Sequence, residues 1–162
     1  MGDLLSFVNL GGRRGLRRAT PAMAWYERGC VAEAAGLAGE AIACYRRCLA
    51  GRPDVADAHN NLGKLLHDRG EVAAAEGHYR LALCVREIGL YWFNLGVALE
   101  DLGGRTAEAL HAYEHAVEVE PGLADAHYNL ARLLDSIGRG TNDELALRRA
   151  VRHYGQYRSL TG

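Results

Sequence analysis

The feature that most constrains this 162-residue chain is a pattern of residue types that recurs about every 34 positions. One series consists of small residues, at Gly29, Gly63, Gly96 and Ala131. A second consists of alanines, each followed four positions later by a tyrosine on the same helical face: Ala41 and Tyr45, Ala75 and Tyr79, Ala109 and Tyr113, Ala150 and Tyr154. A period of this length is typical of stacked helix-turn-helix units, so the sequence predicts an all-α array.

The small residues have a packing role in such an array. Where two helices cross closely, glycine or alanine lets the backbones approach, and a tyrosine opposite fills the remaining space. We expect four glycines to end the first helix of each unit in the left-handed conformation: Gly36, Gly70, Gly103 and Gly138. Pro53 and Pro121 are expected to end second helices.

These residues resemble the tetratricopeptide repeat family, and the resemblance covers roughly 140 positions. It implies a right-handed helical solenoid of about four repeats, at residues 22–55, 56–88, 89–123 and 124–160. Residues 22–162 are therefore predicted to form one repeat domain. Residues 1–21, which contain the sequence GGRRGLRR, are predicted to form a separate basic arm, with Pro21 marking the start of the first helix.

The fourth repeat departs from this pattern. Ala131 and Ala150 are nineteen positions apart, where Gly29 and Ala41 are twelve apart, so GRGTNDE contains an insertion. Thr141 and Glu144 fit a capping box, which predicts that the last helix begins inside the insertion and gains about two turns. No further helix covers its outer side in this prediction. We therefore expect self-association, or docking to another domain, through an uncapped face that contains Leu147, Val151, Tyr157 and Leu160.

Net charge and hydropathy limit the classes of partner and the cellular location that we expect for this chain. A net charge of -1 and a pI near 6.6 give no drive toward nucleic acid or a membrane surface, and we expect neither as a partner. The apolar run LLSFV is too short for a signal peptide core or a membrane span, so a cytoplasmic, bacterial-type protein is predicted.

The sequence also predicts no enzyme and no cofactor. It has no glycine-rich phosphate loop after a strand, no nucleophile elbow and no metalloprotease histidine pair. The four cysteines fall inside helical patterns, which argues against a disulfide framework. Two pairs are spaced one helical turn apart, Cys44 with Cys48 and His111 with His115, but neither has a third ligand at a recognisable spacing, so no metal site is expected.

In this family the first helices line the inner surface, and their side chains form ladders from repeat to repeat. One ladder here is Asn61, Asn94 and Asn129, with Glu27 in the first repeat. It is similar to the asparagine ladder of the O-linked N-acetylglucosamine transferases, in which amides pair with the backbone of an extended peptide. The alternative is that these asparagines only bridge adjacent helices. Neighbouring positions complete the predicted peptide-binding groove: Tyr26, Asn60, Lys64, Phe93, Val97, Asp101, Tyr128 and Arg132.

Charge around this groove is predominantly negative. Lys64 and Arg132 stand against eight acidic residues: Glu33 and the groove residue Glu27, together with Asp57, Asp68, Glu100, Asp101, Asp125 and Asp135. This balance favours a basic protein or peptide partner, unless the acids merely keep the face solvated. Some relatives grip chaperone tails with basic groove residues, but this chain has Tyr26, Leu90 and Asn94 at three of those positions, so we expect no such binding.

The leading hypothesis is therefore a non-catalytic adaptor that holds a peptide segment of a partner in the concave groove. One alternative is the sensing or assembly domain of a bacterial transcription regulator, because residues 27–63 resemble the repeat regions of MerR-type regulators. DNA contact would then involve a missing domain or the arginines Arg13, Arg14, Arg17 and Arg18. A further alternative is the substrate-binding region of a glycosyltransferase, suggested by the asparagine ladder.

Overall fold

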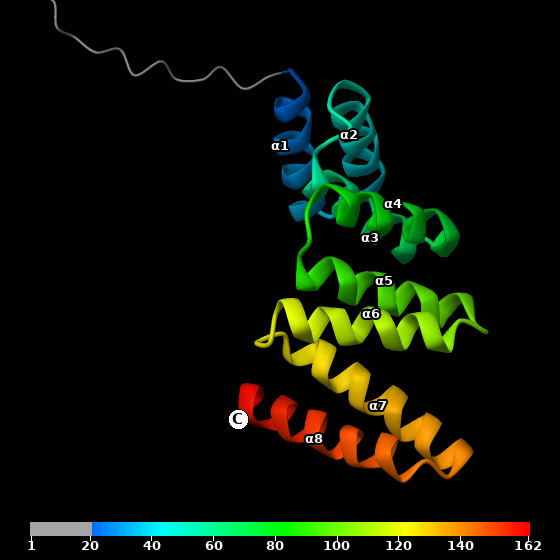
Figure 1. Ribbon diagram of the computed structural model, residues 1–162. Coiled ribbons are helices and arrows are strands. Elements are labelled where there is room, and N and C mark those ends of the chain that lie inside the picture. The colour runs from blue at the N-terminus through cyan, green and yellow to red at the C-terminus, as the bar shows by residue number, and fades with distance from the viewer. Residues whose placement is uncertain (1–20) are drawn as a thin grey trace, which may run out of the picture.

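The computed structural model describes residues 21–162, and these form eight α-helices and no strand (Figure 1). The all-α class and the repeat architecture are confirmed. The predicted basic arm lies outside the described residues, apart from Pro21, which begins α1 as expected. The helices are α1 (Pro21–Ala34), α2 (Ala38–Gly51), α3 (Ala56–Asp68), α4 (Val72–Val85), α5 (Gly89–Leu102), α6 (Thr106–Val119), α7 (Ala124–Thr141) and α8 (Glu144–Thr161).

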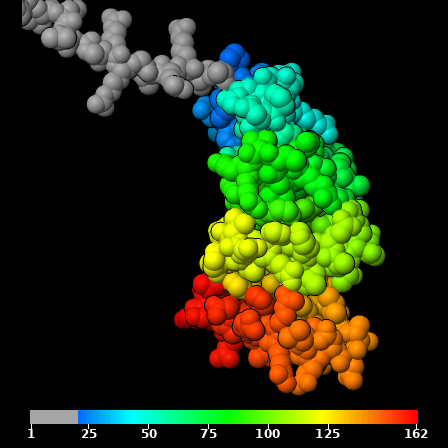
Figure 2. Space-filling model, in the orientation of Figure 1, coloured from blue at the N-terminus to red at the C-terminus, as the bar shows by residue number. Residues whose placement is uncertain are grey.

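The helices form four hairpins that stack in chain order into an elongated, curved array (Figures 1 and 2). Each odd-numbered helix packs on the even-numbered helix that follows it, and α2, α4 and α6 each pack on the first helix of the next hairpin. The core consequently runs along the array instead of gathering at one centre. No helix within residues 21–162 is long and apolar enough to cross a membrane.

The register of small residues and tyrosines is confirmed by the packing. A Cβ placed on Gly29 would lie 2.5 Å from Cε1 of Tyr45, and one on Gly63 would lie 2.8 Å from Cε1 of Tyr79. Gly96 and Tyr113 show the same close approach. These tyrosine side chains are fully buried, so a methyl group at any of the three glycines would push the two helices of a hairpin apart.

Three of the four predicted glycine helix ends have a positive φ, with Gly36 at 73°, Gly70 at 79° and Gly103 at 71°. The prediction for Gly138 is wrong, because this residue lies inside α7, and Asn142 takes the left-handed position instead, at φ 59°. Gly138 has a different role. Its Cβ would lie 2.7 Å from Cγ of Leu147, so glycine permits the close approach of α7 and α8.

The insertion in the fourth repeat lengthens both helices of the hairpin, not only the last. Each of α7 and α8 has 18 residues, whereas the other helices have 13 or 14. The predicted capping box is wrong, since the Thr141 hydroxyl donates to the Ile137 carbonyl within α7. Asp143 is the N-cap of α8 and accepts hydrogen bonds from the backbone N–H groups of Leu145 and Ala146, at 2.9 and 3.2 Å.

Candidate functional site

The predicted groove residues lie on α1, α3, α5 and α7, and we call the surface they form the first-helix face. Five of them are exposed: Glu27, Lys64, Asp101, Tyr128 and Arg132. Six are half-buried: Tyr26, Asn61, Phe93, Asn94, Val97 and Asn129. Asn60 is buried between hairpins, so its amide is not offered on the open surface.

One polar cluster on this face joins the first and second hairpins. The Tyr45 hydroxyl donates to Oε2 of Glu33 at 2.7 Å, and Nζ of Lys64 donates to the other carboxylate oxygen at 2.9 Å. Asn61 adds a longer hydrogen bond of 3.3 Å from Nδ2 to the Tyr45 hydroxyl. Lys64 is thus held by the neighbouring hairpin and does not project freely into the groove.

A matching cluster joins the third and fourth hairpins. The Tyr113 hydroxyl donates to Oε2 of Glu100 at 2.7 Å, and Arg132 Nη2 donates to the same oxygen at 2.6 Å. Asn129 Nδ2 lies 3.5 Å from the Tyr113 hydroxyl, which is a weak hydrogen bond at best. From the sequence, these glutamates were expected only as parts of a general acidic face, and their pairing with the buried tyrosines was not predicted.

Hydrogen bonding in these clusters favours a charged Glu33, and burial keeps Tyr45 and Tyr113 neutral. Burial raises the pKa of Glu33, but hydrogen bonds from Lys64 and Tyr45 outweigh burial and hold that pKa below its ordinary value. For Tyr113, burial and the Glu100 carboxylate both raise the pKa of the phenol. Each tyrosine therefore stays a hydrogen-bond donor across the physiological pH range.

The asparagines make contacts between neighbouring helices. Asn94 Nδ2 donates to Oδ1 of Asn60 at 2.8 Å, which joins α5 to α3, and Asn60 Nδ2 lies 3.4 Å from Oδ1 of Asn61. With the bonds to Tyr45 and Tyr113, each asparagine of the ladder has a partner on another helix. This geometry matches the bridging alternative. Each amide still carries a second N–H group that can face a bound peptide.

Pairing also reduces the net charge of the first-helix face. Four of the eight acids form ion pairs: Glu33 with Lys64, Asp57 with Arg86, Glu100 with Arg132, and Asp135 with Arg139. A fifth, Asp101, has its Oδ2 2.7 Å from Nε2 of His67. Arg86 and Arg139 were not counted from the sequence, and including them lowers the negative excess from six to four. Within residues 21–162, the remaining acids form no ion pair: Glu27, Asp68 and Asp125.

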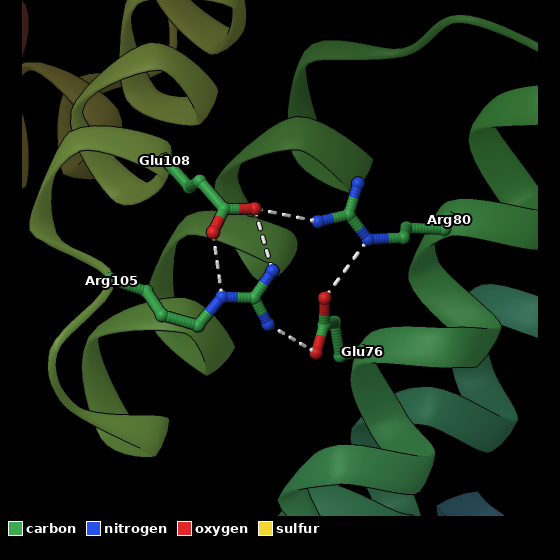
Figure 3. Close-up of polar contacts among 4 residues, drawn as sticks. All are labelled: Glu76, Arg80, Arg105 and Glu108. Carbon is green, nitrogen blue, oxygen red and sulfur yellow. Dashed lines mark hydrogen bonds and ion pairs between the residues drawn. The ribbon is translucent and has the colours of Figure 1, made fainter.

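A second polar network lies away from the groove, between α4 and the start of α6 (Figure 3). Arg105 donates to Glu76 at 2.7 Å and to Glu108 at 2.6 Å, while Arg80 donates to the same two carboxylates at 2.9 and 3.1 Å. The four charges form a closed neutral ring that joins the second and third hairpins. A single ion pair at the surface contributes little to stability, but several charges joined in one network contribute more.

Two hollows of the surface lie largely outside the predicted groove. One, of about 230 Å³, borders this charged ring and is lined by residues that include Trp92, Leu95 and His111. Another, of about 400 Å³, lies at the open end of the first hairpin beside Val31 and Leu37, and Glu27 is the one groove residue that it contains. The first-helix face is therefore an open surface and not an enclosed pocket.

The side-chain pairs weighed as metal ligands lie on single helices. Cys44 and Cys48 are buried in α2, and all four cysteines are free thiols. Nε2 of His111 lies 3.2 Å from Nε2 of His115 on α6. Residues 21–162 contain no group of three or more side chains that could hold a metal ion.

Comparison with known proteins places these features in context. The model of the tetratricopeptide repeat family matches residues 26–92 and 103–158, which is more than half of the chain. No match is found among the curated proteins.

Several solved structures share the fold. A crystal structure of the MamA protein is 21% identical over 86% of this chain and 73% of its own, with a TM-score of 0.73. A MamA structure from Desulfovibrio magneticus RS-1 is 18% identical over 86% of this chain and 75% of its own, with a TM-score of 0.69. The first repeat domain of Spaghetti (RPAP3), bound to the HSP90 peptide SRMEEVD, is 24% identical over 74% of this chain and 95% of its own, with a TM-score of 0.69.

Proposed function

Because this chain belongs to the tetratricopeptide repeat family, we propose that it is a non-catalytic adaptor that holds a peptide segment of a partner protein against the first-helix face. The observation that carries the proposal is a row of accessible aromatic rings at equivalent positions of three hairpins: Tyr26, Phe93 and Tyr128. Aromatic side chains supply large contact areas at low entropic cost, and they dominate many protein interfaces.

The groups around the rings suit an extended peptide. Asn61, Asn94 and Asn129 are half-buried on the same face, and an amide has two N–H groups, so each has a second donor for the backbone carbonyl groups of a ligand. Leu90, which is also exposed, adds an apolar contact near Phe93 on α5. The face thus combines anchors for side chains with donors for the backbone.

We propose that the partner segment is basic. The first-helix face keeps an excess of negative charge after pairing, and Glu27 and Asp125 are exposed on its two end hairpins. Lys64 and Arg132 are each neutralised by a glutamate, so they oppose a cationic ligand little. The charge pattern therefore steers a basic segment toward the face.

The RPAP3 domain provides a precedent for peptide binding on this architecture, since its structure contains the HSP90 peptide SRMEEVD. That peptide is acidic, and this chain carries Tyr26, Leu90 and Asn94 where some relatives use basic residues to grip such tails. We accordingly propose a different ligand class. Calorimetric titration with SRMEEVD is expected to give no binding heat, and a clear isotherm would contradict the assignment.

The test is affinity capture with quantitative mass spectrometry, using a pair of charge-matched variants. The first carries Glu27→Arg and Asp125→Arg on the first-helix face. The control carries Glu118→Arg and Glu144→Arg, which reverse two exposed charges elsewhere. A protein captured by the native chain and the control, but lost with the first variant, supports the groove. If both variants retain every partner, the groove assignment is wrong.

We also propose that the chain self-associates through α8. Leu145 and Val151 are 67% and 72% exposed, and Leu160 is 43% exposed, so α8 presents three apolar side chains that a second copy can cover. Light scattering over a range of protein concentrations tests the idea. The mass should rise with concentration for the native chain and for Val31→Asp at the opposite end, but not for Val151→Asp. A native chain that stays monomeric at high concentration overturns this proposal.

A further inference from the structure

Two histidine pairs with the same geometry occur in the second and fourth hairpins. Nδ1 of His59 on α3 lies 3.0 Å from Nδ1 of His78 on α4. Nδ1 of His127 on α7 lies 2.9 Å from Nδ1 of His153 on α8. Each pair therefore links the first helix of a hairpin to the second.

The tautomers of His59 and His127 follow from the second contact that each ring makes. His127 Nε2 lies 3.0 Å from the Pro121 carbonyl oxygen, and His59 Nε2 lies 3.1 Å from that of Pro53. A carbonyl oxygen can only accept, so Nε2 carries the proton in both rings and Nδ1 offers a lone pair. The hydrogen between the two rings must then come from the second histidine, whose Nδ1–H donates. The arrangement requires both imidazoles to be neutral or, at most, one to be charged.

The other two hairpins lack this device at equivalent positions. The first helices carry Trp25 and Trp92 where His59 and His127 stand. The second helices carry Cys44 and Ala112 where His78 and His153 stand. The first and third hairpins have no histidine pair at this position and therefore serve as internal controls for its effect.

The surroundings of His78 and His153, the second member of each pair, disfavour positive charge. His59 and His127 are 6% exposed. Burial lowers the pKa of His78, and His59 and Arg46 of α2 lower it further. Burial likewise lowers the pKa of His153 from 6.5 to about 4, reinforced by His127 on α7 and by Arg149 and Arg152 on α8, while Glu114 of α6 acts in the opposite direction.

The fourth hairpin differs from the second in what covers it. α4 lies between α3 and α5, whereas α8 packs along α7 at the end of the described array (Figure 1). Arg149 of α8 forms an ion pair with Glu114 of α6. The outer side of α8 is exposed and α8 packs mainly on α7, so its release disrupts one helix interface, whereas release of α4 would disrupt two, with α3 and with α5.

We propose that the His127–His153 pair is an acid-sensitive latch, which holds α8 on α7 at neutral pH and releases α8 when the pair is protonated. This latch would operate whichever partner the first-helix face binds. Its first step is uptake of one proton at Nε2 of His153, which keeps the hydrogen bond but adds a positive charge beside Arg149 and Arg152. A second proton, at Nδ1 of His127, places two donors face to face and breaks the bond.

The sign of the effect follows from the lowered pKa. Released α8 binds a proton at His153 near pH 6.5, whereas packed α8 binds it only near pH 4, so acid favours release. The full shift corresponds to an increase of about 25-fold in the release equilibrium between about pH 7.5 and 5. Because His153 is only half-buried, solvent screening reduces the increase, and we expect about tenfold.

The experiment is hydrogen exchange measured by mass spectrometry at pH 7.5 and pH 5, corrected for the intrinsic pH dependence of amide exchange. In the native chain, the α8 amides should open about tenfold more at pH 5, whereas α2 amides should change little. His153→Ala, which places the residue of the third hairpin at this position, should abolish the difference for α8. His115→Ala, which removes a half-buried histidine of α6 outside both pairs, should leave it intact.

Two results would overturn the latch. One is an α8 opening that is the same at both pH values in the native chain. The other is an opening that rises equally in His153→Ala and in the native chain. If His153→Ala fails to fold, the native chain still decides the matter by nitrogen-15 NMR titration of its histidines. A His127 protonated at Nε2 and a His153 that titrates well below pH 6.5 support the latch, and a His153 that titrates at or above pH 6.5 contradicts it.

Discussion

The second and fourth hairpins are close counterparts in sequence, yet they sit in different surroundings. Both open with an alanine-aspartate-alanine-histidine run, and both contain a histidine pair anchored on a proline carbonyl. Tyr79 of the second hairpin is 1% exposed, whereas its counterpart Tyr154 is half-buried. The same residue type at the same repeat position is therefore a core residue in one place and a partly open one in the other, because a further hairpin covers only the first.

The largest expected difference comes from removing the tyrosine ring of each hairpin. Tyr79→Ala should lower the free energy of unfolding by about 3–5 kcal/mol, because the ring is fully buried against Gly63. Tyr154→Ala should cost about half as much. Urea denaturation followed by circular dichroism measures both. Equal losses would show that the end of the array is as tightly packed as its middle.

A smaller effect separates tight from open glycines in the second hairpin. Gly63→Ala should destabilise by about 1–3 kcal/mol, because its new methyl group would meet the Tyr79 ring. Gly77→Ala on α4 should instead stabilise by about 1 kcal/mol, since no atom lies within 4 Å of the added group. Thermal melting of the two variants gives opposite shifts if the register is correct. A gain in stability for Gly63→Ala would contradict the observed approach of α3 to the tyrosine.

The histidine pairs predict how stability depends on pH. The pKa values of His59, His78 and His153 are all lowered by packing, so the unfolded chain binds more protons than the folded chain below pH 6.5. The contribution of these three neutral histidines to the free energy of unfolding is complete above that pH, and it is lost as the pH falls. We expect a decrease of about 1–2 kcal/mol between about pH 7.5 and 5 after solvent screening. Denaturation of the double variant His78→Ala with His153→Ala should show most of this slope removed, and an unchanged slope would assign it to other groups.

The smallest expected effect concerns the start of α8. Asp143 is its N-cap, whereas no side-chain cap bonds are formed at the starts of α2 to α7. Asp143→Ala should cost about 1 kcal/mol. The loss should appear in hydrogen exchange as faster opening of the first turn of α8, while α4 is unaffected. Thr141→Val is the control, since the Thr141 hydroxyl bonds within α7 and does not cap α8.

The fold was largely predictable because its signals are local and steric. The close contacts at Gly29 and Gly63 require a small residue whatever surrounds them, so the spacing of glycine, alanine and tyrosine reveals the hairpins and their register. The insertion was located correctly, but its division between two helices was not. Two adjacent cap candidates, Thr141 and Asp143, compete there, and the choice depends on how far α7 continues before Asn142 turns the chain.

The candidate site was less predictable, because its contacts join residues from different hairpins. The positions of Lys64 and Arg132 on the first helices were read correctly, but their partners Glu33 and Glu100 emerged only from the packing. The paired histidines carried an available signal, since Pro53 precedes His59 by the same six positions by which Pro121 precedes His127. This proline–histidine spacing recurs only in every second hairpin, whereas the pattern of glycine, alanine and tyrosine recurs in each one. Only the shorter repeat was recognised from the sequence.

The sequence by itself determined the four hairpins and their register, because these follow from helical periodicity and from the volume of single side chains. Tertiary structure decided which amides bridge helices, which acids are neutralised, and which of two equivalent tyrosines is fully covered. Those outcomes depend on contacts of about 3 Å between side chains from separate helices, and a hydrogen bond is lost when donor and acceptor move apart by less than about 1 Å.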